Sequence, residues 1–168
     1  GIPTPWTTIQ LSGPSVRSQI LKMAKDYDDI FIDTGGRDTT SQRAALTIAD
    51  IFIAPFQPRS LDVWTIGMVS TLILEIKAVN PRLRSYAIIN RADPSGSDNN
   101  DASEIIMEFG VIKLIPHQIG SRKAFANAAS LGMGVVELKV QDKKATSEIV
   151  SLSNIISHNN ADLTPEQH

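Results

Sequence analysis

A carboxylate and a glycine pair directly follow the apolar run Ile30–Ile32, with Asp33 first and then Gly35 and Gly36. A carboxylate at the end of a strand can hold Mg²⁺ through water, and glycine lets the backbone approach a phosphate closely. The spacing therefore indicates a loop that contacts a phosphorylated ligand and its metal ion. The alternative interpretation is a loop that only leads into the next helix, with glycines that make the turn.

A second candidate contact follows the apolar pair Ile88–Ile89, where Asn90 and Arg91 stand side by side. An asparagine amide can hydrogen-bond to the edge of a nucleobase, and the planar guanidinium of arginine can stack on its face. Pro116 follows a further apolar run, Val111–Ile115. The alternative for Asn90 and Arg91 is an ordinary solvated loop.

The motifs of several other classes are absent from the sequence. It contains no GxSxG turn of a serine hydrolase and no GxGxxG fingerprint of a dinucleotide-binding enzyme. The histidines, His117, His158 and His168, stand far apart, and there is no cysteine. Neither a histidine metal site nor a thiolate site or disulfide is therefore expected, and the lack of cysteine fits a reducing compartment.

The composition is typical of a globular domain. Of 168 residues, 42% are hydrophobic and 20% charged, which excludes a disordered tail. With a net charge of −2, the bulk charge predicts no nucleic-acid partner. It does not exclude a local basic patch. No apolar run approaches the roughly 18 residues that a membrane span needs, so no membrane partner is predicted.

Apolar runs alternate with segments of helical periodicity along the whole chain. The expected strands are Ile30–Ile32, Asp50–Pro55, Ser85–Asn90, Val111–Ile115 and a short Val135–Val136. The expected helices begin near residues 15, 39, 60, 102, 122 and 142, and the last ends near 158. This order predicts one α/β domain over residues 1–168, with a mostly parallel sheet and helices on both faces.

Two placements follow from these elements. The carboxyl ends of parallel strands share one edge of a sheet, so Asn90 and Arg91 should lie near Pro116 and near the end of the strand before Asp33. On the long helix near residues 60–79, one apolar face should be buried. Its expected members are Met68, Val69, Leu72, Ile73 and Ile76.

In their order along the chain, these segments resemble the ParA/MinD-type partition ATPases, and most closely the small single-domain ParA-like proteins of plasmid partition. The resemblance runs through Ile30–Asp38, Ala49–Pro55 and Pro58–Asp62. It continues through Ile88–Arg91, which is similar to the strand that frames adenine, and through Ile115–Glu137, which is similar to the closing strand, helix and turn. It covers about residues 27–137.

The resemblance implies roles for the residues singled out above. Asp33 would be the Walker B carboxylate that acts on Mg²⁺ through water, and no other residue of this chain is expected to contact the metal. The switch loop that senses the terminal phosphate of ATP would contain Gly35, Gly36 and Arg37. Asn90 and Arg91 would flank the base, and Pro116 would line its pocket.

The same resemblance implies a cytoplasmic protein that serves ATP-dependent DNA segregation. ATP would be held between the subunits of a homodimer, which binds DNA non-specifically and is stimulated by a centromere-binding adaptor. The candidate DNA contacts are Arg122, Lys123, Lys139, Lys143 and Lys144. The alternative for these residues is a solvated helix face.

One departure from the family pattern concerns the phosphate loop. No glycine in the sequence is followed by lysine, so the Walker A motif GxxxxGK[ST] is absent. The expected fold is therefore of the deviant Walker P-loop NTPase type without its first strand, phosphate loop and second strand. We expect a fragment of a longer protein. The alternatives are a shortened paralogue and a non-catalytic binding or dimerisation module that has lost ATP hydrolysis.

Overall fold

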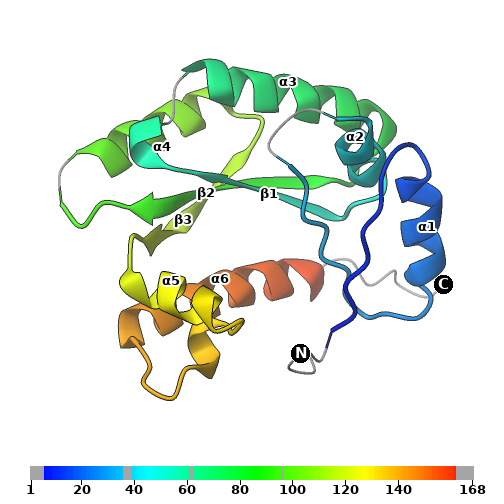
Figure 1. The fold of residues 1–168 in the computed structure, drawn as a ribbon. Coiled ribbons are helices and arrows are strands. Elements are labelled where there is room, and N and C mark those ends of the chain that lie inside the picture. Colours follow the sequence, from blue (N-terminus) through cyan, green and yellow to red (C-terminus); the bar gives the residue numbers. More distant parts are fainter. Residues whose placement is uncertain (1–5, 36–38, 61–62, 96, 162–168) are drawn as a thin grey trace. The chain divides into compact units, whose positions relative to one another are not determined.

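The computed structural model of the chain describes residues 6–35, 39–60, 63–95 and 97–161 (Figure 1). The chain forms two compact units, residues 1–52 with 69–85 and residues 53–68 with 86–168. The helices of the described residues are α1 (Val16–Met23), α2 (Thr40–Leu46), α3 (Val63–Val79), α4 (Asp98–Phe109), α5 (Lys123–Ser130) and α6 (Lys143–Ala161). The strands are β1 (Ile51–Phe56), β2 (Arg84–Ala92) and β3 (Lys113–Gly120), and two 3₁₀ turns are η1 (Pro58–Ser60) and η2 (Val135–Glu137).

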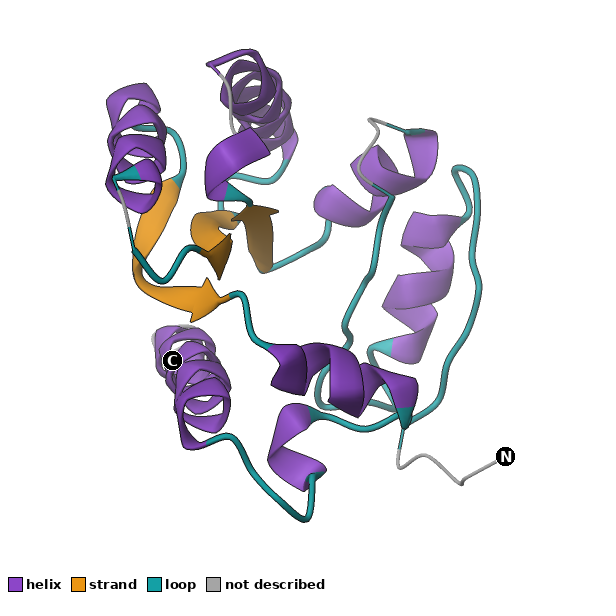
Figure 2. Cartoon of the chain, turned by 60° about the vertical axis from the view of Figure 1, so that its left-hand side comes forward, coloured by secondary structure: helices purple, strands orange, loops and turns teal. Residues whose placement is uncertain are grey.

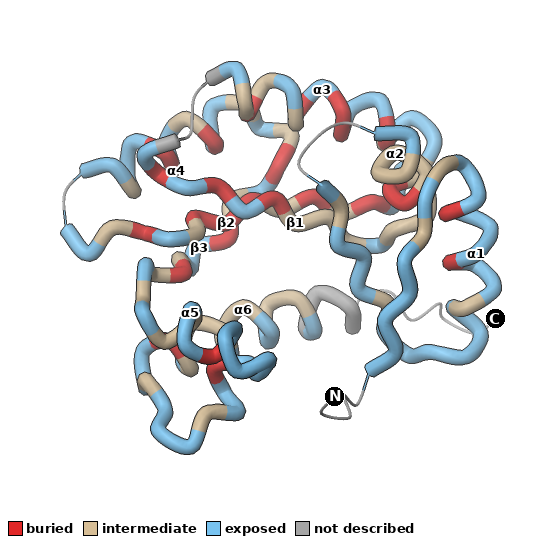
Figure 3. The backbone as a smooth tube through the Cα atoms, in the orientation of Figure 1, coloured by how far each residue is buried: buried red, intermediate tan, exposed pale blue. Residues whose placement is uncertain are grey.

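The described strands form a three-stranded sheet in the order β1-β2-β3 (Figure 2). β2 and β3 pair in parallel, with Tyr86 opposite Lys113 and Asn90 opposite Ile119. The central strand β2 is the most buried, with Ala87, Ile88 and Ile89 almost without solvent contact (Figure 3). A strand that is apolar on both faces is typical of a sheet covered by helices, and the predicted α/β fold class is confirmed.

Helices lie on both sides of the sheet in the second unit. α4 and α6 both contact β3 and lie on opposite sides of the strands (Figure 1). Ile88, Ile115 and Ile119 form the buried centre of the α6 side. α6 packs against this centre with Ile149, Leu152 and Ile155, whose spacing of three residues keeps them on one helix face.

The first unit has its own small core, in which α1 and α2 pack together around Val16, Ile20 and Ala45. The hydroxyl of Thr39 caps α2 by accepting the backbone N–H of Gln42 at 3.1 Å.

The end of α2 is fixed by a residue that follows α3. The side-chain amide of Asn80 donates to the carbonyl oxygens of Leu46, at 2.9 Å, and Ala49, at 2.8 Å. The carbonyl of Leu46 belongs to the last turn of α2, whose carbonyls have no donor within the helix, and Ala49 follows three residues later.

The predicted strand at Ile30–Ile32 is wrong. This segment has no regular secondary structure, and Phe31 is 90% exposed. Ile30 instead packs against the core of α1 and α2. A run of three apolar residues is too short to specify a strand. Here Ile30 is half-buried by packing against helices instead of by pairing in a sheet.

Two further predictions change in detail. β3 begins and ends later than predicted and runs through Pro116, which lies in an irregular part of its pairing with β2, between Leu114 and Gln118. Proline is tolerated there because a bulge needs no ladder hydrogen bond.

The predicted strand at Val135–Val136 is instead the turn η2. The backbone N–H of Gly134, just before this turn, donates to the carboxylate of Glu137.

The expected buried face of the long helix is largely correct. Leu72, Ile73 and Ile76 are buried, and Val69 is half-buried. Met68 is the error, since it is 65% exposed. None of the helices in the described parts of the chain is long and apolar enough to cross a membrane.

Candidate functional site

A small cavity of about 150 Å³ lies at the carboxyl ends of β2 and β3. Its lining residues come from the strand ends, the loops that follow them and α6: Ala92, Asp93, Pro94, Gln118, Gly120, Ser121, Arg122 and Glu148. The backbone N–H of Ser121 donates to the carbonyl of Ala92 at 3.0 Å, so the two strand ends stay paired up to the rim. This is the edge at which parallel sheets bind ligands.

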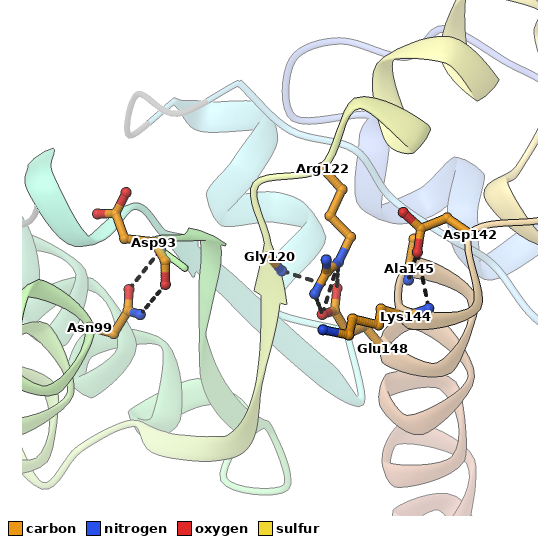
Figure 4. Close-up of polar contacts among 8 residues, drawn as sticks. All are labelled: Asp93, Asn99, Gly120, Arg122, Asp142, Lys144, Ala145 and Glu148. Carbon is orange, nitrogen blue, oxygen red and sulfur yellow. Dashed lines mark hydrogen bonds and ion pairs between the residues drawn. The ribbon is translucent and has the colours of Figure 1, made fainter. Parts of the chain in front are cut away.

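Asp93 forms the β2 side of the cavity and is held from three directions. Its backbone N–H donates to Oδ1 of Asn99 at 3.0 Å, and Nδ2 of Asn99 donates to its carbonyl at 2.8 Å (Figure 4). Its carboxylate pairs with Nε of Arg59 at 2.9 Å, and Arg59 also approaches Asp98 at 3.4 Å. The Asp93 side chain is only 16% exposed, so this wall of the cavity has a fixed acceptor.

Arg122 and Glu148 form the opposite side. Nη2 of Arg122 lies 2.6 Å from Oε1 of Glu148, and Nε lies 3.1 Å from both carboxylate oxygens. Glu148 also accepts the backbone N–H of Gly120 at 3.1 Å (Figure 4). One carboxylate from α6 therefore fixes both the last residue of β3 and the guanidinium beside it.

The pair also shifts the ionisation of its members. Burial by itself raises the pKa of Glu148, but the hydrogen bonds from Arg122 and Gly120 and the charge of Arg122 outweigh it, so the pKa lies below its ordinary value. The hydrogen bond to Glu148 raises the pKa of the Arg122 guanidinium. Both groups are therefore charged at neutral pH.

The predicted base contacts Asn90, Arg91 and Pro116 lie on the same two strands, shortly before the cavity. Asn90 is half-buried, whereas Arg91 and Pro116 are exposed, and none of the three lines the cavity. Asn90 and Pro116 thus lie on adjacent strands, β2 and β3, as expected.

Arg91 occupies an unusual backbone conformation. Its φ of 54° lies in the left-handed region, which non-glycine residues rarely adopt, and the pairing with β3 shifts register between Asn90 and Ala92. The side chain of Asn90 supports this bulge, because its Oδ1 accepts the backbone N–H of Arg91 at 3.0 Å. Bulges of this kind are enriched next to binding sites, where they redirect a side chain.

The predicted phosphate-side residues belong to the first unit. Asp33 is exposed on a segment without regular structure, and Gly35 is exposed as well. Because none of the described residues before Asp33 lies in a strand, the expected position of this carboxylate at a strand end is not found. Gly36 and Arg37, which complete the predicted switch loop, lie outside the described residues.

The candidate DNA contacts separate into two groups. Arg122 is half-buried and its charge is balanced by Glu148. The four lysines are all exposed: Lys123, Lys139, Lys143 and Lys144. Lys123 is the first residue of α5, and Lys143 and Lys144 are the first two of α6.

Helix beginnings normally favour acidic residues, because the backbone dipole is positive there. The first turns of α5 and α6 contain no acidic residue. Asp142 caps α6 instead, with Oδ1 accepting the backbone N–H groups of Lys144 and Ala145 at 3.0 and 3.1 Å (Figure 4). At the start of α6, the acidic group that faces the dipole is therefore the capping residue Asp142.

Sequence reasoning missed two of the residues that shape the cavity. Asp93 stands only two residues after Arg91, and its place directly after a strand was an available signal. Glu148 gave no signal, because it reaches the cavity from a helix 26 residues beyond its partner Arg122.

The cavity is small. Its volume is below the roughly 300–1,000 Å³ that is usual for complete small-molecule sites. Asp93 and Gln118, which both have side-chain oxygens that can accept hydrogen bonds, are among its lining residues.

Comparisons with known proteins agree with this arrangement. A family model described as ATPase MipZ matches residues 12–92. The chain is also similar to the Maintenance of carboxysome distribution protein A of Halothiobacillus neapolitanus, with 24% identity over 138 residues. The alignment covers 81% of this chain and 63% of that protein, so the chain spans less than two thirds of this relative's length. Together with the order of motifs and the α/β fold, these matches support the resemblance of the chain to the ParA/MinD-type ATPases.

Proposed function

We propose that the chain binds the base of ATP in the cavity at the ends of β2 and β3, as part of an ATP-dependent partition or positioning protein. The observation that carries this proposal is the cavity itself, which lies at the ligand-binding edge of a parallel sheet and has fixed acceptors on its walls. The relative named for the maintenance of carboxysome distribution favours a positioning role, and plasmid or chromosome partition is the form that we propose here.

In this proposal, Asn90, Arg91 and Pro116 frame the base above the cavity. The planar guanidinium of Arg91, which is exposed at the bulge, suits stacking on the face of a purine. Asp33 acts on Mg²⁺ through water, and Gly35, Gly36 and Arg37 form the switch loop beside the terminal phosphate. The 168 residues contain no Walker A loop, so hydrolysis requires phosphate contacts that this chain does not supply.

We further propose that the protein acts as a cytoplasmic homodimer with an adaptor, and that Lys123, Lys139, Lys143 and Lys144 bind the DNA backbone. Exposed lysines suit phosphate because their positive charge attracts it, and Lys123, Lys143 and Lys144 lie at the beginnings of helices. Such contacts carry no sequence information, in line with non-specific binding. Arg122 contributes less in this proposal, because Glu148 already balances its charge.

Titration of the chain with adenosine, followed by amide NMR, tests the base site. We expect shifts centred on Ala92, Gln118 and Gly120, and a weaker affinity in Gln118→Ala. His117→Ala is the matched control, because His117 is the neighbouring residue of β3 and does not line the cavity. Shifts elsewhere, or equal affinity in both variants, would contradict the proposed site. Absence of binding would instead favour a non-catalytic binding or dimerisation module.

A further inference from the structure

Glu148 differs from the other residues of the cavity in its origin. It is the residue that α6 contributes, whereas the others come from the ends of β2 and β3 and the loops after them. Its carboxylate has three hydrogen-bonding groups in reach: Nε and Nη2 of Arg122 and the backbone N–H of Gly120. The arrangement therefore joins a helix, a strand end and the beginning of α5 through one side chain.

The helix that carries Glu148 is firmly placed. The neighbouring residue Ile149 packs into the apolar centre beneath β2 and β3, together with Leu152 and Ile155. One turn earlier, Ala145 is fully buried and its N–H is capped by Asp142. Because this helix is firmly packed, the carboxylate of Glu148 has little conformational freedom. Its hydrogen bonds can therefore fix the position of the Arg122 guanidinium.

Arg122 is packed closely against the strand end as well as being paired. A Cβ placed on Gly120 would lie 3.1 Å from Nη2 of Arg122 and 3.2 Å from Nε. The guanidinium thus lies flat against a residue that has no side chain. Without Glu148, nothing in these contacts would hold this long, flexible side chain, and it would sample rotamers that enter the cavity.

We propose that Glu148 is the positioning residue of this pocket: from α6, it holds Arg122 against Gly120 and thereby keeps the β3 wall open for the base. This inference rests on the proposed binding of a nucleobase and adds the residue that sets the geometry of the site. Glu148 itself need not touch the ligand.

The charged groups that act on Glu148 come from two elements. Arg122, just before α5, attracts the carboxylate, and Asp142, at the start of α6, repels it. Lys144 stands one helical turn before Glu148 on the same helix (Figure 4). The pairing with Arg122 provides the short contacts, so removal of Glu148 frees the guanidinium, whereas removal of Arg122 leaves no long side chain to enter the cavity.

The test uses the full 168-residue chain with adenosine as the probe, in a double-mutant cycle of Glu148→Gln and Arg122→Gln. We expect Glu148→Gln to weaken adenosine binding about tenfold, a change that corresponds to about 1.4 kcal/mol. We expect Arg122→Gln and the double variant to bind adenosine about as well as the parent chain, because the long side chain that would enter the cavity is absent from both. Glu104→Gln, which removes an exposed carboxylate from α4, is the matched control and should leave binding unchanged.

A second readout separates positioning from a general loss of structure. The Nε–H resonance of Arg122 should be distinct and protected in the parent chain and should merge with those of exposed arginines in Glu148→Gln. Gly120→Ala offers an independent route, because the added methyl group displaces the guanidinium without removing a charge. It should also weaken adenosine binding, even if Glu148→Gln fails to fold.

The outcomes distinguish the two proposals. If the parent chain binds adenosine and Glu148→Gln binds equally well after losing the Arg122 signal, the positioning role is wrong and the base site stands. If Gly120→Ala leaves affinity unchanged although the Arg122 signal moves, the positioning role is also wrong. If the parent chain does not bind adenosine, both proposals are overturned.

Discussion

At the scale of single residues, the region around the cavity combines a strained backbone with a tightly paired carboxylate. Among the described residues, Arg91 is the non-glycine residue with a positive φ, and the conformation costs about 1–2 kcal/mol for an L-residue. Glu148 is ionised below its ordinary pKa range because of Arg122 and Gly120, despite its burial. The first feature lowers stability and the second raises it, and each can be measured separately.

Arg91→Gly should remove the backbone strain and the proposed stacking contact together. We expect the free energy of unfolding to rise by up to about 1 kcal/mol, since glycine adopts this conformation freely but loses more entropy on folding. Adenosine affinity should fall in the same variant. Chemical denaturation and NMR titration measure the two effects. Arg82→Gly, at an exposed turn residue without a positive φ, is the control and should not stabilise the chain.

The pairing of Glu148 predicts a specific dependence of stability on pH. A carboxyl group with a lower pKa in the folded chain contributes its stabilisation fully above its ordinary pKa and loses it as the pH falls through the folded value. At neutral pH, Glu148→Gln should therefore be less stable than the parent by about 1–2 kcal/mol.

This difference in stability should shrink across the acid range and vanish below the folded pKa of Glu148. Denaturation curves of the parent and of Glu148→Gln, recorded at a series of pH values, measure it. A difference that is constant from neutral to strongly acidic pH would contradict the ionised pair, whereas Glu104→Gln should show no such trend.

At the scale of elements, the sequence predicts long segments well and short ones poorly. The helices α1, α3, α5 and α6 and the strands β1 and β2 follow their periodicity, and Gly110 ends α4 in the left-handed conformation expected of a C-cap. The strand predicted at Ile30–Ile32 is wrong because three apolar residues are too few to distinguish a strand from other structures. β3 was placed too early because Pro116 suggested an end, and no pattern in the sequence shows where a bulge accommodates a proline.

The beginning of α6 offers a test of the DNA proposal at this scale. Replacing both Lys143 and Lys144 by glutamate should stabilise the helix by a few tenths of a kcal/mol per residue, since acidic side chains suit the positive end of the dipole. The same change should weaken DNA binding and reduce its salt-dependence slope by about 2. Lys113→Glu, an exposed lysine of β3 in the same unit, is the control. Unchanged DNA affinity in the double variant would contradict the proposed contact.

At the scale of the whole molecule, only part of the candidate site can be predicted from the sequence. The strand-end position of Asn90 and Arg91 follows from the alternation of strands and helices. The contacts that shape the cavity do not, because Glu148 pairs with Arg122 across 26 positions of the chain and Arg59 pairs with Asp93 across 34. Such contacts depend on how helices pack, and a single sequence contains no periodic signal for them.

We expect the 168-residue chain not to hydrolyse ATP. Turnover requires the terminal phosphate to be aligned and its charge neutralised, and the family uses the amides and lysines of the phosphate loop for this. Loss of even one such donor slows catalysis by about 10²–10³-fold. A phosphate-release assay on the purified chain measures this. Activity above background that disappears in Asp33→Ala would contradict the expectation.

The amide of Asn80 has a consequence for the time course of folding. α2 has seven residues, fewer than the roughly 12–15 that an isolated helix needs to persist in water. The carbonyl of Leu46, at its end, and that of Ala49, just after it, accept hydrogen bonds from Asn80. Asn80 lies 34 positions after Leu46 and 31 after Ala49. At about 5–20 residues per second, a ribosome takes roughly 2–6 s to cover that distance. During synthesis, α2 therefore leaves the ribosome well before the residue that completes it.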